Sequence, residues 1–142
     1  MFPRTNKSFT LLELLVVIAI ISLLVVISST TYMQYKEKAR QETIGANLSQ
    51  VRRVADVIFG IKFSYTDLCT KENGDFVDED FQEIVEAVKR INYNRLIECV
   101  TDGDDYCIST EVQNGKHFCV DSSGSVGFID SALGCNGGTI CP

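Results

Sequence analysis

The chain has 142 residues and a formal net charge of −6, and it contains six cysteines. This length suits one ordinary domain. The acidic balance argues against broad electrostatic attraction to nucleic acid, so we expect no specific nucleic-acid partner. A small domain outside the cytoplasm is typically stabilised by disulfides. We therefore expect disulfides among the cysteines, which all lie beyond residue 60: Cys69, Cys99, Cys107, Cys119, Cys135 and Cys141.

An apolar stretch runs from Phe9 to Ile27. As a helix at about 1.5 Å per residue it would be roughly 28 Å long, close to the hydrocarbon thickness of a bilayer. Arg4 and Lys7 precede it without any acid, which places the N-terminus in the cytoplasm and the cysteines outside. The stretch is longer than the core of a cleaved secretory signal, and no small-x-small cleavage site follows it. We predict a membrane-spanning segment at residues 9–29.

One carboxylate, Glu13, interrupts this stretch. A bare charge at mid-bilayer costs about 2.5–3.5 kcal/mol, and less near the edge, where Glu13 would lie. No Lys, Arg or His occurs between Phe9 and Thr31, so this stretch offers no ionic partner except a chain terminus made by cleavage nearby. Acids inside membrane segments usually have a partner and a function. The alternative is a plain signal anchor whose Glu13 reaches the lipid surface.

The segment MFPRTNKS followed by FTLLELLVVIAIISLLVVI resembles the N-terminus of type IV pilins and pseudopilins, which carry a class III signal peptide. That class has a short basic leader, a cut just before Phe, and Glu as the fifth residue after the cut. The resemblance implies that a prepilin peptidase cuts between Ser8 and Phe9 and methylates the new amine of Phe9. It also implies that Glu13 pairs with the N-terminal amine of a neighbouring subunit during assembly. Ser8 departs from the family, which mostly has Gly there, and the midway Pro of many members is missing.

Physical chemistry agrees with that role for Glu13. An N-terminal amine has a reference pKa near 7.7–8.0, so it is mostly cationic at neutral pH. Two opposite charges brought together in an apolar fibre core are far cheaper than either alone. The acid would then set the register, because every stagger that leaves it unpaired is penalised.

Residues 30–60 extend the helix as an amphipathic segment. Its apolar side chains recur at steps of three and four, which predicts one buried stripe, and Gly60 is a natural helix stop. The predicted division is a leader at 1–8, a transmembrane and filament-core helix at 9–29, its amphipathic continuation at 30–60, and a disulfide-bonded globular head at 61–142. The stripe comprises Ile44, Leu48, Val51, Ala55 and Ile58.

The head pattern predicts a second helix and three strands. Asp78 is a good N-cap for a helix with one apolar face, and capping explains the nearby acids better than a calcium loop does. Strands are expected at Arg95–Thr101, Tyr106–Val112 and His117–Asp121, with a tight turn between the last two. The apolar face of the helix comprises Phe81, Ile84, Val85, Val88 and Ile91.

The expected hairpin register bears on the cysteines. If Asn114 and Gly115 form the loop, Thr110 faces Cys119, and Cys107 then lies on the other face of the ribbon from Cys119. These two cysteines are therefore expected to find partners elsewhere, for instance Cys69 or Cys99. Six cysteines allow many connectivities. We predict only one pair, Cys135 with Cys141, because the Asn-Gly-Gly segment between them can fold back.

Catalysis and metal binding have little support in the sequence. His117 is the only histidine, no C-x-x-C pair occurs, and Cys–His chemistry would need a free thiol. No phosphate loop, paired metal ligands or serine elbow occurs. We therefore expect no enzyme activity, no catalytic residue, no cofactor and no metal.

We expect an α+β, pilin-like fold: a long N-terminal helix, half transmembrane and half amphipathic, packed on a small antiparallel sheet. The expected function is that of a pilin in a type IV pilus-like extracellular filament, serving motility, adhesion or DNA uptake. Its partners would be copies of itself, prepilin peptidase and the membrane assembly machinery. Two alternatives stay open: a pseudopilin of type II secretion or competence, and a signal-anchored surface binding protein. The chain would be single-pass before assembly and extracellular afterwards.

Overall fold

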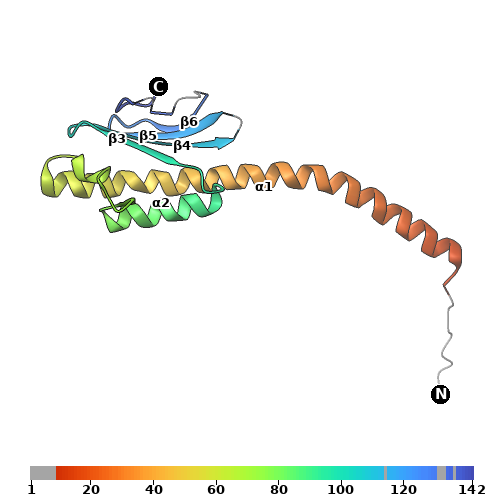
Figure 1. The fold of residues 1–142 in the computed structure, drawn as a ribbon. Coiled ribbons are helices and arrows are strands. Elements are labelled where there is room, and N and C mark those ends of the chain that lie inside the picture. Colours follow the sequence, from red (N-terminus) through yellow and green to blue (C-terminus); the bar gives the residue numbers. More distant parts are fainter. Residues whose placement is uncertain (1–8, 114, 131–133, 136) are drawn as a thin grey trace, which may run out of the picture. The chain divides into compact units, whose positions relative to one another are not determined.

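The structure is a computed structural model that describes residues 9–113, 115–130, 134–135 and 137–142. The predicted leader, with Ser8, lies outside these ranges. The chain divides into two units, Met1–Lys38 and Ala39–Pro142, and one long helix contributes to both. The elements are α1 (Leu11–Lys62), a short 3₁₀ helix (Thr66–Leu68), β1 (Lys71–Glu72), β2 (Asp75–Phe76), α2 (Glu79–Ile91), β3 (Ile97–Thr101), β4 (Tyr106–Gln113), β5 (Lys116–Asp121) and β6 (Val126–Ile129) (Figure 1).

Between Leu11 and Ile27, α1 is apolar on all sides apart from Glu13 and Ser22. Its large aliphatic side chains between Leu11 and Ile27 are all exposed. Among the described residues, α1 is the one helix long and apolar enough to cross a membrane. A helix that is hydrophobic all round needs lipid or other helices around it. The predicted membrane-spanning segment therefore lies on a continuous helix.

The second unit holds the hydrophobic core. The predicted stripe of α1 is confirmed, because Ile44, Leu48, Val51, Ala55 and Ile58 are all buried. Phe81, Val85 and Val88 of α2 join the same cluster, and Ile84 and Ile91 pack against it. Asp78 is the N-cap of α2, as predicted, and its Oδ1 accepts from Phe81 N at 2.8 Å. The sheet contributes Ile97, Tyr106, Ile108, Val112, Phe118 and Val120 to the core.

The main sheet is antiparallel with the order β3-β4-β5-β6. The three strands expected from the sequence are present, but the prediction of a three-stranded sheet was wrong, because β6 adds a fourth. That strand is short and has Gly127 inside it, which weakens the strand pattern. A second small sheet pairs β1 with β2 around Asn73 and Gly74, which both have positive φ angles, as a type I′ turn requires.

The β4–β5 register differs from the predicted one by a single residue. Gln113 pairs with Lys116, as a two-residue loop requires, but the next pair is Glu111 with His117. Val112 is thus an extra residue on β4, which is a β-bulge. Cys119 consequently faces Ser109 rather than Thr110. A one-residue slip moves side chains to the opposite face, so Cys107 and Cys119 share one face, contrary to the prediction.

A polar cluster ties α1 to the end of α2 and to β4 within the second unit. Asn92 is fully buried, and its Oδ1 accepts from Arg40 Nη1 at 2.7 Å. Its Nδ2 donates to Thr110 Oγ1 at 3.1 Å and to the Glu111 carbonyl at 2.8 Å. Arg40 Nη2 also donates to the Val112 carbonyl at 3.0 Å. Buried polar groups that are hydrogen-bonded in this way fix one arrangement of the elements around them.

Candidate functional site

Glu13 lies in the first turn of α1, where it bonds to Thr10. Thr10 N donates to Glu13 Oε2 at 3.0 Å, and Thr10 Oγ1 donates to the same oxygen at 2.9 Å. In return, Glu13 N donates to Thr10 Oγ1 at 3.2 Å. This reciprocal pattern is a capping box, in which a Thr at the N-cap and a Glu three residues later satisfy each other's backbone N–H groups.

The capping box gives Glu13 a partner that the sequence reasoning missed. The prediction for Glu13 took only ionic partners into account, whereas the spacing Thr-x-x-Glu before an apolar run is itself a helix-start signal. Negative charge in the first turn also suits the positive end of the helix dipole. These two effects lower the cost of a carboxylate in an apolar stretch.

The capping box uses only part of the hydrogen-bonding capacity of the Glu13 carboxylate. An ionised carboxylate has about four acceptor sites, and Thr10 uses two of them, both on Oε2. Phe9 immediately precedes Thr10, and its side chain is exposed. A cut before Phe9 would create an ammonium group next to the residue that holds the acid. The arrangement can therefore offer a fixed negative charge to an amine.

The head contains three disulfides that use all six cysteines. They are Cys69–Cys99, Cys107–Cys135 and Cys119–Cys141. The predicted pair Cys135–Cys141 was wrong, as was the suggestion that Cys107 or Cys119 reaches Cys69 or Cys99. The physical reason is the bulge at Val112, which turns Cys107 and Cys119 to the same face of the sheet. Each then binds one cysteine of the C-terminal segment.

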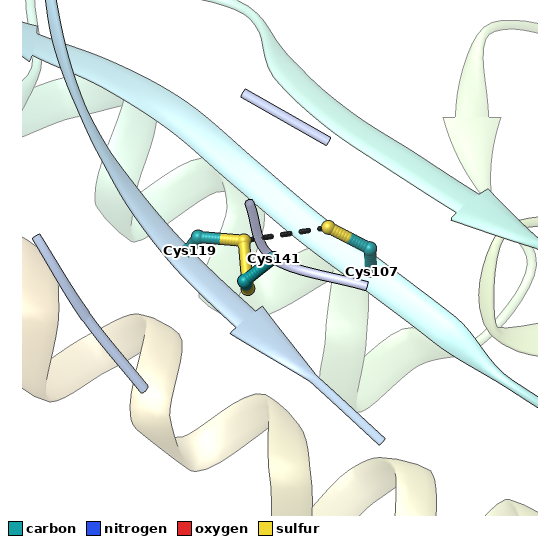
Figure 2. A group of neighbouring side chains, drawn as sticks. All are labelled: Cys107, Cys119 and Cys141. Carbon is teal, nitrogen blue, oxygen red and sulfur yellow. Dashed lines mark hydrogen bonds between the residues drawn. A yellow bond between two sulfur atoms is a disulfide. The ribbon is translucent and has the colours of Figure 1, made fainter. Parts of the chain in front are cut away.

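Two of these disulfides pack against each other. Figure 2 shows Cys107, Cys119 and Cys141 together, with Cys107 Sγ 3.4 Å from Cys119 Sγ. Both sulfurs are already bonded to another cysteine, so neither carries a hydrogen and the contact is van der Waals packing. A metal ligand must be a thiolate, so this sulfur group does not offer a metal site while its disulfides are intact. The second small core of the head forms around it.

A buried carboxylate, Asp121, anchors the end of the chain to the sheet. Its Oδ2 accepts from Cys141 N at 2.8 Å. Its Oδ1 accepts from Ser123 Oγ at 2.7 Å, Ser125 N at 2.9 Å and Gly124 N at 3.1 Å. Burial raises the pKa of this carboxyl, but the hydrogen bonds from Cys141, Ser123, Ser125 and Gly124 together outweigh that effect and hold the pKa below its usual value. The sequence reasoning did not single out Asp121.

A second anchor holds the segment around Cys135. Cys135 N donates to Glu98 Oε2 at 3.1 Å and to Ser109 Oγ at 3.1 Å. Gly134 has φ +54, and a Cβ there would lie 2.4 Å from Ser109 Oγ. Glycine is thus required at this position by both backbone conformation and space. His117 lies beside it, but Cys–His catalysis has no nucleophile here because every cysteine is in a disulfide.

The comparisons with known proteins bear on the N-terminal site. Residues 3–29 match the family model described as the prokaryotic N-terminal methylation motif. This match supports a prepilin of the type IV pilin or pseudopilin type. Neither a curated protein nor a solved structure matches the chain.

The matched residues include Ser8, Phe9 and Glu13, and they end within α1, just beyond the apolar run. The class to which the motif belongs is structural rather than enzymatic. The motif and the apolar helix together indicate membrane anchoring. The match does not extend into the head, so the description of the head rests on the fold: a long helix packed on antiparallel strands.

Proposed function

We propose that this prepilin is the structural subunit of a type IV pilus-like extracellular filament, built through its N-terminal helix. The observation that carries the proposal is the carboxylate of Glu13, held at the start of an apolar helix beside Phe9 and inside a methylation motif. Cleavage between Ser8 and Phe9 supplies the amine, prepilin peptidase methylates it, and Glu13 of one subunit pairs with the amine of a neighbour. The leader, residues 1–8, is removed.

The head supports an extracellular location for the assembled form. Its three disulfides join strands and loops that all lie beyond residue 60. Disulfides persist in oxidising spaces and are rare in the cytosol. The exposed apolar surface of α1, residues 11–27, would be covered by lipid before assembly and by the helices of other copies afterwards. The membrane assembly machinery would drive the transfer between these two states.

The capping box allows the charge of Glu13 to be tested separately from its role in the helix. Glu13→Gln keeps a residue that functions in a capping box but removes the charge. Thr10→Ala removes the cap but keeps the charge. If Glu13 pairs with an amine, Glu13→Gln abolishes sheared surface filaments while Thr10→Ala still forms them.

The readout is the amount of chain in the sheared fraction, with the membrane fraction as the measure of expression. Normal filaments in Glu13→Gln would show that the charge of Glu13 is not needed and would contradict the pairing. Loss of filaments in Thr10→Ala alone would show that the cap matters and the charge does not. If the unaltered chain is recovered only in the membrane fraction, the signal-anchored surface protein is favoured instead.

A further inference from the structure

Both helices of the head end on an exposed aromatic residue in the left-handed backbone conformation. Phe63 follows α1 with φ +55, and its N–H donates to the Phe59 carbonyl at 2.8 Å. Tyr93 follows the C-cap of α2 with φ +54, and Asn94 N donates to the Lys89 carbonyl at 2.9 Å. The first bond is that of an αL C-cap and the second that of a Schellman motif. In both motifs the left-handed residue is normally glycine, because other residues are strained in that conformation.

The side chains at these positions face solvent. Phe63 is 78 % exposed and Tyr93 is 73 % exposed. Apart from the Arg40 contact with the Tyr93 ring, such exposed and strained aromatic side chains add little to the stability of an isolated head. Backbone strain of this kind clusters at functional positions.

Other exposed apolar side chains lie close in sequence to each of the two aromatics, and each group is called a patch here. The α1 patch consists of Val57, Ile61 and Phe63, of which Val57 and Ile61 are one helical turn apart. The α2 patch consists of Tyr93 and Leu96, and Leu96 is 85 % exposed. Several large apolar side chains exposed at one end of an element are typical of an interaction site.

The two patches lie at opposite ends of the head. Ser64, next to Phe63, donates to the Gly103 carbonyl, in the loop just before β4 begins. Asn92, next to Tyr93, donates to the Glu111 carbonyl near the other end of β4. Arg40 lies over the Tyr93 ring, 4.9 Å from its centroid. Phe63, just beyond the end of α1, is 23 residues after Arg40, which corresponds to about 35 Å at about 1.5 Å per residue.

The charges around the two patches have opposite signs. The loop that bonds to Ser64 carries Asp102 and Asp104, both exposed, while Lys62, the cation beside Phe63, is paired with Asp67. The α2 patch has Arg40 over the Tyr93 ring and Arg90 exposed in the last turn of α2. An apolar contact surrounded by complementary charges favours one partner and one orientation.

We propose that the α1 patch of one subunit docks on the α2 patch of the next copy of this chain, as a head-to-tail contact in the filament. A contact between two different patches on identical subunits is heterologous, and it repeats without closing into a helical fibre. The strained aromatics are then contact residues that glycine could not replace. This inference rests on the proposed filament function.

Phe63→Gly tests the contact without endangering the fold. Glycine suits the left-handed position, so the thermal midpoint of the full chain in detergent micelles should not fall. Loss of the aromatic ring should reduce the sheared filament fraction by about tenfold, the size expected for a central contact residue. Ile140→Ser is the matched control, because Ile140 is exposed outside both patches, and it should leave the filament fraction unchanged.

Photocrosslinking identifies the neighbour directly. Benzoylphenylalanine placed at position 63 of the full chain in sheared filaments should crosslink to another subunit, in the tryptic peptides Ile91–Arg95 or Leu96–Lys116. The same probe at position 96 should label Phe63–Lys71 of another subunit. The digest is reduced first, because the Cys69–Cys99 disulfide joins these two peptides within one chain. Suppose that the unaltered chain forms filaments. If Phe63→Gly then assembles normally and these crosslinks are absent or reach another protein, the docking proposal is wrong while the proposed function still stands. If unaltered chain forms no filaments, the proposed function fails.

Discussion

Thr10 and Glu13 satisfy each other's backbone N–H groups at the start of the apolar helix, through bonds of 3.0 and 3.2 Å. The acid is thereby held at one place relative to Phe9 before any neighbouring subunit arrives. A charge that is fixed in advance loses less conformational freedom when it pairs. The local capping bond thus prepares the side chain for the proposed pairing between subunits.

Thr10→Ala should loosen the first turn of α1. The substitution removes the hydroxyl that accepts from Glu13 N and donates to Glu13 Oε2, and loss of a Thr cap costs about 1 kcal/mol. Hydrogen exchange of the Glu13 and Leu14 amides, which bond to Thr10, should accelerate by about fivefold in detergent micelles. Glu13→Gln should change this exchange less, since Gln keeps the box. Equal protection in Thr10→Ala and the unaltered chain would contradict the capping role.

Asp121 should make the stability of the head sensitive to acid. Its folded pKa is below the unfolded value near 3.9, so its contribution is fully present above about pH 4 and is lost as the pH falls through the folded pKa. Asp121→Asn should cost about 2 kcal/mol at pH 7, because an amide NH₂ would face Cys141 N–H or the donors of the 123–125 turn. It should also flatten the fall in thermal midpoint between about pH 5 and pH 2.

The control for this pH series is Asp130→Asn. Asp130 pairs with Lys116 at 2.8 Å on the surface, where such pairs contribute about 0–1 kcal/mol. The acid dependence of the thermal midpoint should therefore survive in this variant. A series in which Asp121→Asn and Asp130→Asn behave alike would refute the role of the buried carboxylate.

Gly45 and Gly60 should respond oppositely to alanine, although both lie inside α1. A Cβ at Gly45 would lie 2.8 Å from Phe118 Cε2, so Gly45→Ala forces the ring to move within the core and should destabilise the head by about 1–2 kcal/mol. Nothing lies within 4 Å of a Cβ at Gly60. Gly60→Ala should therefore stabilise the chain by about 0.5–1 kcal/mol through helix propensity. If the thermal midpoint in micelles shifts in the same direction for both variants, the close packing of α1 on β5 is contradicted.

The disulfide pairs can be mapped by cleavage without reduction. Chymotrypsin cuts after Phe128, and hydroxylamine cuts the Asn136–Gly137 bond, which separates Cys119, Cys135 and Cys141 onto different fragments. The fragment Gly137–Pro142 should remain linked to the Cys119 fragment, and the Cys135 fragment to that of Cys107. A link between Gly137–Pro142 and the Cys135 fragment would contradict the structure.

Much of the fold could be predicted from periodicity and from residue types at element ends. The stripe from Ile44 to Ile58 and the cap at Asp78 follow from the repeat of apolar residues and from the side chain that bonds Phe81 N. The cysteine pairing could not be predicted, because the bulge at Val112 is not encoded in a turn signal and reverses the face of every residue before it. The anchors at Asp121 and Glu98 were missed for a related reason: they depend on where the C-terminal segment returns to the sheet.

At the N-terminal site the prediction of Phe9 and Glu13 rests on residue types, and one contact was overlooked. The basic leader and the apolar run indicate both residues, and the methylation motif at 3–29 covers them, while their roles stay predictions. The bond from Thr10 follows from the Thr-x-x-Glu spacing, which is present in the sequence but did not enter the prediction.

The mass of the N-terminal peptide from sheared cell-surface material tests the central claim most directly. The account predicts a chain that begins at Phe9 with a methylated amine and is recovered in filaments. An unprocessed chain that begins at Met1 and is found only in the membrane fraction would contradict it.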